Sequence, residues 1–252
     1  MMIDRAPINA IGIIPARYAS TRLPGKPLLT IGQKTIIQHV YERSKLALEQ
    51  VIVATDDERI YEEVQRFGGA AIITSAHHQS GTDRVREALD NCRITPDVVI
   101  NIQGDEPFVS PTLLTELVRC FSDPNTDIAT PIFAYPSDTP RDEIANPNQV
   151  KVVTSADGYA LYFSRFPIPY QRAEYTTTYF RHIGLYAFRS EVLREVTDLP
   201  VSPLERSESL EQLRWLQAGY RIKTIETQEL SIGIDTPEDL EKARAYYSQR
   251  EQ

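Results

Sequence analysis

The sequence has few of the residues on which secreted and membrane proteins depend. Its two cysteines, Cys92 and Cys120, are far apart and belong to no paired motif, so two reduced thiols are expected rather than a disulfide framework. No apolar run approaches the ~20 residues of a membrane helix. Residues 1–9 contain Asp4 and no apolar core, which argues against a secretion signal. These absences predict a soluble, cytoplasmic protein that does not bind membranes.

Positive charge is also scarce. The chain of 252 residues has 27 Lys and Arg against 35 Asp and Glu, which gives a net charge of −8. Binding to nucleic acids or anionic membranes in general needs a basic surface and is therefore not expected. The length allows one large α/β domain or two small ones. A ligand that carries phosphates would need a local cluster of cations.

Side-chain patterns for zinc binding and covalent catalysis are missing too. The adjacent His77 and His78 have diverging side chains, and no Cys or third His lies at the spacing of zinc ligands, so no zinc site is predicted. No Ser–His–Asp or Cys–His order stands out, which leaves covalent catalysis without support.

What is present is an alternation of short apolar strands and amphipathic helices through the first half. Thr55-Asp56-Asp57-Glu58 has the spacing of a capping box, and Gly68-Gly69 ends the helix that follows. Such alternation predicts parallel βαβ units. The expected strands are residues 8–14, 51–54, 70–73 and 98–102, and the expected helices include 35–48 and 82–91.

The pattern changes at about residue 127. Asp157-Gly158 is a hairpin turn signal between two stretches of β-branched and aromatic residues. Thr236-Pro237 has the N-cap and first-position proline of a helix start. The expected elements of this half are the hairpin strands 150–154 and 159–164, a β-like stretch at 178–188 and a helix at 205–218. The sequence therefore predicts an α/β fold with a Rossmann-like, mixed, mostly parallel sheet, helices on both faces, and an antiparallel β insertion in the second half.

One segment concentrates cations where a strand ends. The apolar run 11–14 stops at Pro15, and Arg17, Arg22 and Lys26 follow without a single acid. The layout is typical of a loop that binds polyanions beyond the carboxyl end of a strand, although a solvated basic turn is the alternative. It matches neither the P-loop nor the dinucleotide motif. Further donors for phosphate oxygens in this segment are Ser20, Thr21 and Gly25.

Two aspartates follow apolar runs and are candidate metal ligands. Asp105 comes after the strand 98–102 and Gly104, and Asp235 comes after the run 231–234. Mg²⁺ is bound in proteins through one or two carboxylates together with phosphate and water. Taken singly, each acid is better explained by structure alone, Asp105 by a solvated turn and Asp235 by a helix N-terminus. Taken with the cationic loop, the two aspartates predict a site for a metal and a triphosphate.

Further candidates have weaker support. Ser80-Gly81 opens a helix and is suited to contact a base or ribose, or is simply a helix cap. Arg165 is a candidate clamp for a carboxylate, or part of a surface ion pair. His182 is read first as a structural hydrogen-bonding group. Three residues share one face of the expected helix and form a polar face for a sugar, or a solvated surface: Glu208, Glu211 and Gln212.

Taken together, the motifs resemble the 3-deoxy-manno-octulosonate cytidylyltransferases, also called CMP-Kdo synthetases. Two blocks resemble this family or its CMP-sialate relatives most specifically: the first loop, residues 13–27, and residues 103–107. The matching blocks run in order over nearly the whole chain, from about residue 11 to 245. They are residues 13–27, 78–84, 101–107, 146–148, 150–153, 160–165, 181–184, 210–214 and 235–240.

The resemblance implies an enzyme that transfers CMP from CTP to 3-deoxy-D-manno-octulosonate, with Mg²⁺ as cofactor and pyrophosphate as second product. The family forms homodimers and supplies activated sugar for lipopolysaccharide biosynthesis. The implied nucleotide contacts are Ala16, Arg17, Ser20, Thr21, Arg22, Lys26, Ser80, Gly81 and Arg84. The implied sugar contacts are Gln103, Arg165, His182, Glu211 and Gln212, and the implied metal ligands are Asp105 and Asp235. The implied catalytic residues are Arg17, Lys26, Asp105 and Asp235.

The resemblance also implies a fold like that of the nucleotide-diphospho-sugar transferases, in a single domain over residues 1–252. Its parts are a nucleotide-binding half at about 8–125, a sugar-binding and dimerisation half at about 126–230, and the end of a strand that carries a metal ligand, followed by a closing helix, at about 231–250. The family often has a histidine where this chain has Arg206-Ser207-Glu208-Ser209, which bears on the choice of sugar. Alternatives are a cytidylyltransferase for 8-amino-octulosonate or sialate, a uridylyltransferase acting on a sugar 1-phosphate, and a CTP-binding module without catalysis.

Overall fold

The computed structural model describes residues 8–19, 22–173 and 177–250. The chain divides into two units, of which the first comprises Met1–Thr115 and Ser231–Gln252 and the second Glu116–Leu230. Segments from both ends of the chain therefore build the first unit. Over the described ranges, no helix combines the length and the apolar character that a membrane crossing needs.

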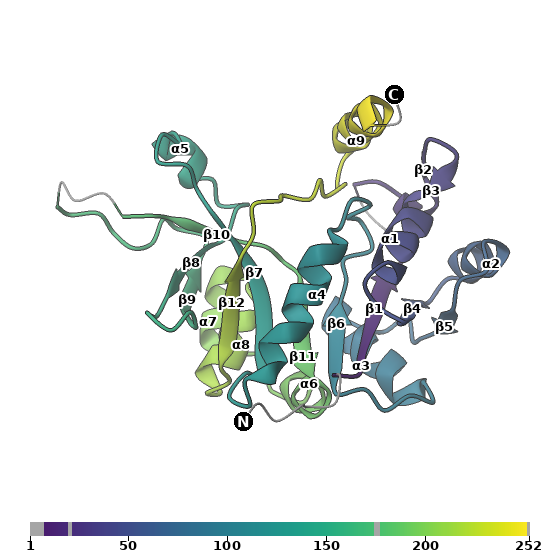
Figure 1. Ribbon diagram of the computed structural model, residues 1–252, viewed down its shortest axis with the longest axis horizontal. Coiled ribbons are helices and arrows are strands. Elements are labelled where there is room, and N and C mark those ends of the chain that lie inside the picture. The colour runs from purple at the N-terminus through teal and green to yellow at the C-terminus, as the bar shows by residue number, and fades with distance from the viewer. Residues whose placement is uncertain (1–7, 20–21, 174–176, 251–252) are drawn as a thin grey trace, which may run out of the picture. The chain divides into compact units, whose positions relative to one another are not determined.

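The first unit is built on four parallel strands in the order β5-β4-β1-β6. Their apolar residues are buried: Ile11, Ile13 and Ile14 of β1 have no exposed surface. Continuous apolar runs are typical of parallel strands covered on both faces. The strands are β1 (Ala10–Ala16), β4 (Gln50–Thr55), β5 (Ala71–Ile73) and β6 (Val98–Asn101) (Figure 1).

Three helices connect these strands: α1 (Ile36–Lys45), α2 (Glu58–Arg66) and α3 (Gly81–Asn91). The chain moves from β1 through β4 to β5 in one direction and then returns to β6 on the other side of β1. Because βαβ crossovers are right-handed, α1 and α2 cover one face of the sheet and α3 the other. The strand order reverses between β1 and β6, and ligands of such sheets bind beyond the carboxyl ends at this point.

The remaining elements of the first unit frame this edge of the sheet. The C-terminal helix starts as predicted, because Thr236 Oγ1 accepts a hydrogen bond from Asp239 N at 3.2 Å. It packs on α1 through an aromatic contact, in which the ring centroids of Tyr247 and His39 are 5.3 Å apart. The elements are η1 (Lys26–Leu28), β2 (Thr30–Ile31), β3 (Lys34–Thr35), α9 (Pro237–Arg250) and the start of α4 (Pro111–Arg119).

The second unit is organised around β7 (Ile128–Ala134). β12 (Ile222–Glu226) pairs with it in parallel, whereas β10 (Phe180–His182) and β11 (Tyr186–Arg189) pair with it antiparallel. The predicted hairpin is present and joins the unit through the pairing of β8 with β10. The other elements are η2 (Cys120–Ser122), α5 (Arg141–Ile144), β8 (Lys151–Thr154), β9 (Ala160–Ser164), α6 (Ser190–Thr197), α7 (Pro203–Glu208) and α8 (Gln212–Gln217).

The predicted fold class, a mixed and mostly parallel sheet with helices, is confirmed, but three predicted elements were wrong. The expected helix 205–218 is two helices, because Ser209 adopts a left-handed conformation, with φ of 51°, that ends α7. The expected strand 178–188 is interrupted by a tight turn in which Leu185 N donates to Ile183 O at 2.8 Å. The run 231–234 is not a strand, so Asp235 does not end one.

Candidate functional site

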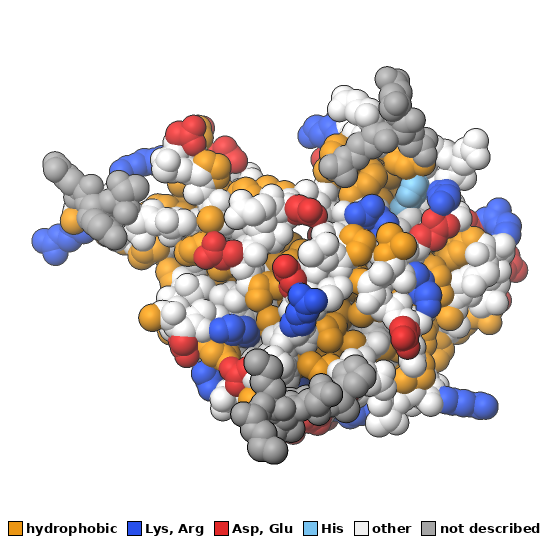
Figure 2. Space-filling model, in the orientation of Figure 1, with side chains coloured by type: hydrophobic (Ala, Val, Ile, Leu, Met, Phe, Trp, Pro, Cys, Tyr) orange, Lys and Arg blue, Asp and Glu red, His pale blue; other side chains and the backbone are white. Residues whose placement is uncertain are grey.

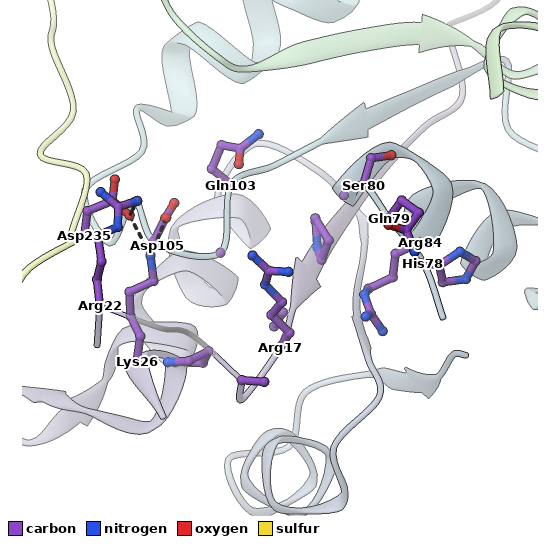
Figure 3. Close-up of a pocket in the computed structure, with 16 residues that line it drawn as sticks. Arg17, Arg22, Lys26, His78, Gln79, Ser80, Arg84, Gln103, Asp105 and Asp235 are labelled. Atoms are coloured by element: carbon purple, nitrogen blue, oxygen red, sulfur yellow. Dashed lines mark hydrogen bonds and ion pairs between the residues drawn. The ribbon is translucent and has the colours of Figure 1, made fainter. Parts of the chain in front are cut away.

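A cavity of about 380 Å³ lies at the carboxyl edge of the first unit's sheet. Its walls come from the loop after β1, the loop after β6, the start of α3 and the segment before α9 (Figure 3). This is the edge at which the strand order reverses, so backbone topology alone directs these loops to one place. The lining side chains include Ala16, Arg17, Arg22, Lys26, Ser80, Gly81, Arg84, Gln103, Asp105 and Asp235.

The loop after β1 is held in a tight fold that fixes Lys26. Gly25 has φ of 68°, and a Cβ at this position would lie 3.1 Å from the ring of Tyr18. Gly25 N also donates to Tyr18 O at 3.0 Å, and Lys26 N donates to Leu23 O at 3.2 Å. The predicted nucleotide contacts Ser20 and Thr21 lie outside the described residues.

The loop after β6 approaches the end of β1 closely. A Cβ on Gly104 would lie 2.8 Å from the carbonyl oxygen of Pro15, so only glycine allows this approach without a backbone shift. Asp105 O then accepts a hydrogen bond from Ile234 N at 3.0 Å. This single bond brings the segment before α9 to the cavity and explains how Asp235 reaches Asp105 without belonging to the sheet.

Asp105 and Asp235 converge on one ammonium group. Lys26 Nζ lies 2.6 Å from Asp105 Oδ2 and 3.2 Å from Asp235 Oδ1, and Arg22 lies 3.1 Å from the same Asp235 oxygen. The Lys26 side chain is 14% exposed, whereas that of Arg22 is 64% exposed. Two acids and two bases thus form one cluster, with Lys26 at its sheltered centre (Figure 3).

The donor set of this cluster fits Mg²⁺. Two carboxylates that already contact a common cation are within reach of a single metal ion, and oxygen is the ligand that Mg²⁺ prefers. The described part of the chain contains no group of three or more His, Cys, Asp or Glu arranged to hold a metal. Any metal bound here would therefore complete its shell with water or with phosphate oxygens, which is how Mg²⁺ is usually bound beside nucleotides.

The opposite wall of the cavity is the first turn of α3. Ser80 accepts from Asp83 N at 3.1 Å, and the Asp83 carboxylate accepts from Ser80 N, which forms a capping box. The guanidinium of Arg84 donates to Asp56 at 2.9 Å and to Thr74 at 2.7 Å. Arg84 therefore fastens α3 to the strand ends with its charge already paired, and its role as a nucleotide contact stays a prediction.

Arg17 differs from the other cations of the cavity. Its side chain is exposed, and among the residues that the structure describes it makes no hydrogen bond or ion pair. Figure 3 shows its guanidinium in the open space between the acid cluster and the start of α3. A cation placed in this way is free to bind an anion that enters the cavity.

Of the predicted sugar contacts, Gln103 lines this cavity, and the other four lie in the second unit. Arg165 donates to three backbone carbonyls, those of Glu208 at 2.6 Å, Pro147 at 2.9 Å and Ser209 at 3.2 Å. In this arrangement it ties the end of β9 to the junction of α7 and α8.

Glu208 does not share a helical face with Glu211 and Gln212, contrary to prediction, because the break at Ser209 places it at the end of α7. It accepts hydrogen bonds from Ser164 Oγ at 2.7 Å and Arg165 N at 2.8 Å. Glu211 forms an ion pair of 2.7 Å with Arg214, and Gln212 is buried. Glu208 therefore stabilises the second unit, while Glu211 and Gln212 stand together at the start of α8.

His182 is buried in the second unit, where its Nε2 lies 3.0 Å from Thr130 Oγ1. Its ring contacts those of Phe163 and Tyr186, with centroids 5.0 and 5.2 Å apart. Burial, and then the charge of Arg181, lower the pKa of His182 to about 3. The imidazole is therefore neutral at physiological pH.

Comparison with known proteins identifies the family to which the chain belongs. The family model described as "Cytidylyltransferase" matches residues 11–225. The chain belongs to the cytidylyltransferase family. A protein named 3-deoxy-manno-octulosonate cytidylyltransferase from Parabacteroides distasonis is 52% identical over 95% of this chain and 98% of its own length. A protein of the same name from Porphyromonas gingivalis is 50% identical over 94% of this chain and 96% of its own.

Among solved structures, a CMP:2-keto-3-deoxy-manno-octonic acid synthetase complexed with CTP superimposes with a TM-score of 0.90. It is 46% identical to this chain, with 96% of this chain and 99% of that chain covered. The resemblance to the 3-deoxy-manno-octulosonate cytidylyltransferases is therefore confirmed at the level of the family. Cytidylyltransferases are nucleotidyltransferase enzymes, as the sequence predicted.

Three residues of this cytidylyltransferase were assigned no role from the sequence. His78 lines the cavity, and with Ser75 N it keeps the pKa of Glu87 below its ordinary value although burial opposes this shift. The signal for His78 was its place in the block 78–84. Lys151 is fully buried and donates to the carbonyls of Asn146, Gln149 and Arg165 at 3.0, 2.6 and 2.5 Å. A lysine in a strand gives no such signal.

The third is Tyr186. Its hydroxyl is buried and, within the described ranges, has no hydrogen-bond partner. Burial and then the charge of Glu211 raise the pKa of this phenol well above its ordinary value. Buried tyrosine hydroxyls normally have a partner, but an aromatic residue in a strand reads as core in a sequence, so no pattern pointed to it.

Proposed function

We propose that this cytidylyltransferase transfers CMP from CTP to 3-deoxy-D-manno-octulosonate and releases pyrophosphate, in the biosynthesis of lipopolysaccharide. One observation carries the proposal: the cavity of the first unit joins two convergent aspartates to three loop cations. A nucleoside triphosphate bound with Mg²⁺ needs this combination of charges. The names of the relatives that cover nearly the whole chain support CTP and the octulosonate as the two substrates.

The nucleotide would occupy the cavity with its phosphates toward the loop after β1. The free guanidinium of Arg17, with Arg22 and Lys26, would bind the triphosphate and neutralise the charge that develops on departing pyrophosphate. Ala16, Ser80 and Gly81 would contact the base and ribose through backbone and hydroxyl groups. Arg84 would act on the nucleotide by holding the start of α3 in place.

Asp105 and Asp235 would hold Mg²⁺. When bound, this ion would neutralise phosphate charge and lower the pKa of the attacking hydroxyl. The anomeric hydroxyl of the sugar would give up its proton to water and form a bond to the α-phosphorus, while the bond from this phosphorus to the oxygen that bridges to the β-phosphate breaks and pyrophosphate leaves. No covalent enzyme intermediate is required, because positioning and charge neutralisation account for most catalysis of this kind.

The predicted sugar contacts are Gln103 in the first unit and four residues of the second unit. Glu211 and Gln212 offer polar groups for the hydroxyls of the sugar, and the neutral His182 offers a hydrogen bond without a charge. The carboxylate of the sugar would be bound by Arg165 once its guanidinium exchanges a backbone carbonyl for it. A homodimer that acts in the cytoplasm completes the proposal.

A pyrophosphate-release assay with several sugars tests the proposal. With CTP and Mg²⁺, we expect turnover with 3-deoxy-D-manno-octulosonate and markedly lower turnover with sialate, and none with UTP and glucose 1-phosphate. Parallel measurement with the 8-amino-octulosonate decides which of the two octulosonates is preferred. Binding of CTP without pyrophosphate release on any of these sugars would reject the enzyme and favour a CTP-binding module.

Replacing either metal-ligand candidate should remove most of the activity. We expect Asp105→Asn and Asp235→Asn each to lower kcat/KM at least ~100-fold, or ~3 kcal/mol of transition-state stabilisation, with the fold intact. The matched control is Asp90→Asn, because Asp90 also forms a short ion pair in the first unit, 2.7 Å to Arg86, but lies on the far end of α3. Near-normal turnover of either site variant would reject these ligands.

A further inference from the structure

The position of Lys26 in the acid cluster has a consequence for how metal and nucleotide bind. Its Nζ is within hydrogen-bond distance of one oxygen of Asp105 and one of Asp235, the two proposed metal ligands. The two contacted oxygens are Asp105 Oδ2 and Asp235 Oδ1, and an ammonium competes with a divalent cation for the space and the negative charge at these oxygens. A metal that binds through the same two oxygens must therefore displace Lys26.

The charges of the cluster make such displacement unfavourable for a metal alone. Two carboxylates face one ammonium and one guanidinium, so the cluster is balanced before any metal arrives. Arg22 is largely exposed, and solvent screens its contribution. Lys26 is sheltered and held by the tight loop at Gly25. Lys26 is thus the cation with which a metal has to compete.

A triphosphate removes this obstacle because it brings a new partner for the displaced ammonium. The same cavity that holds the acids is also lined by Arg17, in the loop after β1, toward which the phosphates would lie. A lysine is suited to the exchange, since its ammonium is a compact charge on a flexible stem and donates in any of three directions. Lys26 would leave the carboxylates as phosphate oxygens become available to it.

We propose that Lys26 occupies the aspartate pair in place of the metal until CTP arrives, and that its transfer to the phosphates couples metal binding to nucleotide binding. The inference rests on the proposed function, because it takes Asp105 and Asp235 as the metal ligands. It assigns to Lys26 a positioning role in the free enzyme that precedes its role at the triphosphate. Metal binding by the free enzyme is then weak, because Lys26 competes with the metal for the two carboxylates.

Measuring Mn²⁺ binding without any reaction tests this exchange. Electron paramagnetic resonance of free Mn²⁺ gives its dissociation constant with the protein alone and with CTP present but no sugar, after subtraction of the Mn²⁺ that the same CTP binds without protein. For the unaltered enzyme we expect CTP to tighten Mn²⁺ binding at least about tenfold. For Lys26→Met we expect Mn²⁺ alone to bind about tenfold more tightly than to the unaltered enzyme, and the effect of CTP to shrink correspondingly.

Matched variants separate the exchange from a general loss of positive charge. Lys34→Met removes another ammonium of the first unit, one that pairs with Glu42 at the same distance of 2.6 Å, and should leave Mn²⁺ binding unchanged. Lys26→Arg keeps the charge and should not gain affinity for Mn²⁺ alone. Lys26→Gln is a second uncharged variant, and circular dichroism and thermal unfolding establish that each variant is folded.

The outcomes distinguish this inference from the proposed function. If Lys26→Met and Lys26→Gln fold and bind Mn²⁺ alone no better than the unaltered enzyme, the exchange is rejected while the transferase reaction stands. If Asp105→Asn retains full Mn²⁺ affinity, the metal lies elsewhere and the exchange is rejected together with the metal ligands. Absence of pyrophosphate release with every sugar rejects the proposed function itself.

Discussion

The imidazole of His182 shows how a single buried side chain is fixed by its surroundings. Two backbone carbonyl oxygens lie within hydrogen-bond distance of Thr130 Oγ1, Leu185 O at 2.8 Å and Ile183 O at 3.1 Å. The hydroxyl donates its only hydrogen to one of them. Its oxygen is then left to accept from His182, which favours the tautomer that carries the proton on Nε2. A neutral imidazole with one favoured tautomer results.

Burial of this imidazole makes stability depend on pH. The pKa of His182 is lowered to about 3 in the folded protein, against ~6.5 in the unfolded chain. Between these values the unfolded chain binds a proton that the folded protein does not. The contribution of His182 to the free energy of unfolding is therefore fully present above pH ~6.5 and is lost as the pH falls. We expect the free energy of unfolding to fall by ~2 kcal/mol between pH 6.5 and 5, measured by urea denaturation.

The window above pH 5 isolates histidines, because carboxylates titrate mostly below it. His182→Gln should flatten the pH dependence of the unfolding free energy, whatever it does to stability at neutral pH. His77→Gln, at an exposed site of the first unit, should leave the slope unchanged. An equal slope for His182→Gln and the unaltered protein would mean that this histidine is protonated in the folded state.

At this scale the sequence predicted identities better than geometry. The cations, the two aspartates and the start of α3 were singled out because charge and glycine placement are visible in a sequence. Lys151 and the unpartnered hydroxyl of Tyr186 were missed, because their environment depends on which backbone segments fold around them. The structure likewise shows that Arg84 is already paired, which no spacing rule indicates.

At the scale of elements, two helices begin with the same motif in different units. Ser80 caps α3 and Ser202 caps α7, and in both the third helical residue is an acid that completes a capping box. Each serine satisfies a backbone N–H that would otherwise lack a partner. Only the first of these caps lines the cavity, so the pair separates the structural role of a cap from a role in binding.

We expect Ser80→Ala and Ser202→Ala each to lower the free energy of unfolding by ~1 kcal/mol, because each loses one cap. Only Ser80→Ala should also weaken CTP binding, since its hydroxyl and the first turn of α3 face the proposed nucleotide. Chemical denaturation gives the first quantity and isothermal titration calorimetry with CTP the second. Equal CTP affinities for both variants would remove Ser80 from the nucleotide contacts.

Elements were predicted well where their signals are local. The strands of the first unit and the starts of α1, α3 and α9 follow from apolar runs and capping residues next to one another in the chain. The helix 205–218 was predicted as continuous because no proline or glycine interrupts it there. Its break at Ser209 is sustained by distant partners, chiefly Arg165, which donates to the carbonyls of Glu208 and Ser209.

At the scale of the whole molecule, the charge balance is acidic while the proposed ligands are anions. On the face drawn in Figure 2, basic and acidic side chains are interspersed and no large area carries a single sign. The net charge of −8 therefore gives no long-range attraction for CTP. Affinity for the triphosphate has to come from the few cations at the carboxyl edge of the first unit's sheet.

The sequence predicted this edge because strand order follows from βαβ crossovers, but it did not predict the partition of the chain. The segment 231–252 belongs to the first unit, and the hydrogen bond from Ile234 to Asp105 that anchors it joins residues far apart in the sequence. Contacts of this range leave no periodicity behind. A shared metal site requires Asp235 to lie beside Asp105, but the spacing of the two residues in the sequence does not predict it.

The second unit exposes apolar side chains where the family resemblance places a dimer contact. Phe166 and Tyr170, in the segment after β9, are 70% and 81% exposed, and they line a cavity of about 580 Å³. Large aromatic side chains this exposed around one cavity are typical of a surface that contacts a partner, and aromatic anchors usually dominate the binding energy of interfaces. We therefore expect the protein to be a homodimer in solution through this surface.

Phe166→Asp should weaken this dimer by at least ~30-fold in its dissociation constant, because each protomer loses an aromatic anchor and gains a charge that must be desolvated. Sedimentation equilibrium over a range of concentrations measures the effect. Leu46→Asp is the matched control, since Leu46 is 74% exposed but belongs to the first unit, and it should leave the dimer intact. A dimer that Phe166→Asp does not weaken would place the interface elsewhere, and a monomeric unaltered protein would show that these aromatic residues serve another partner.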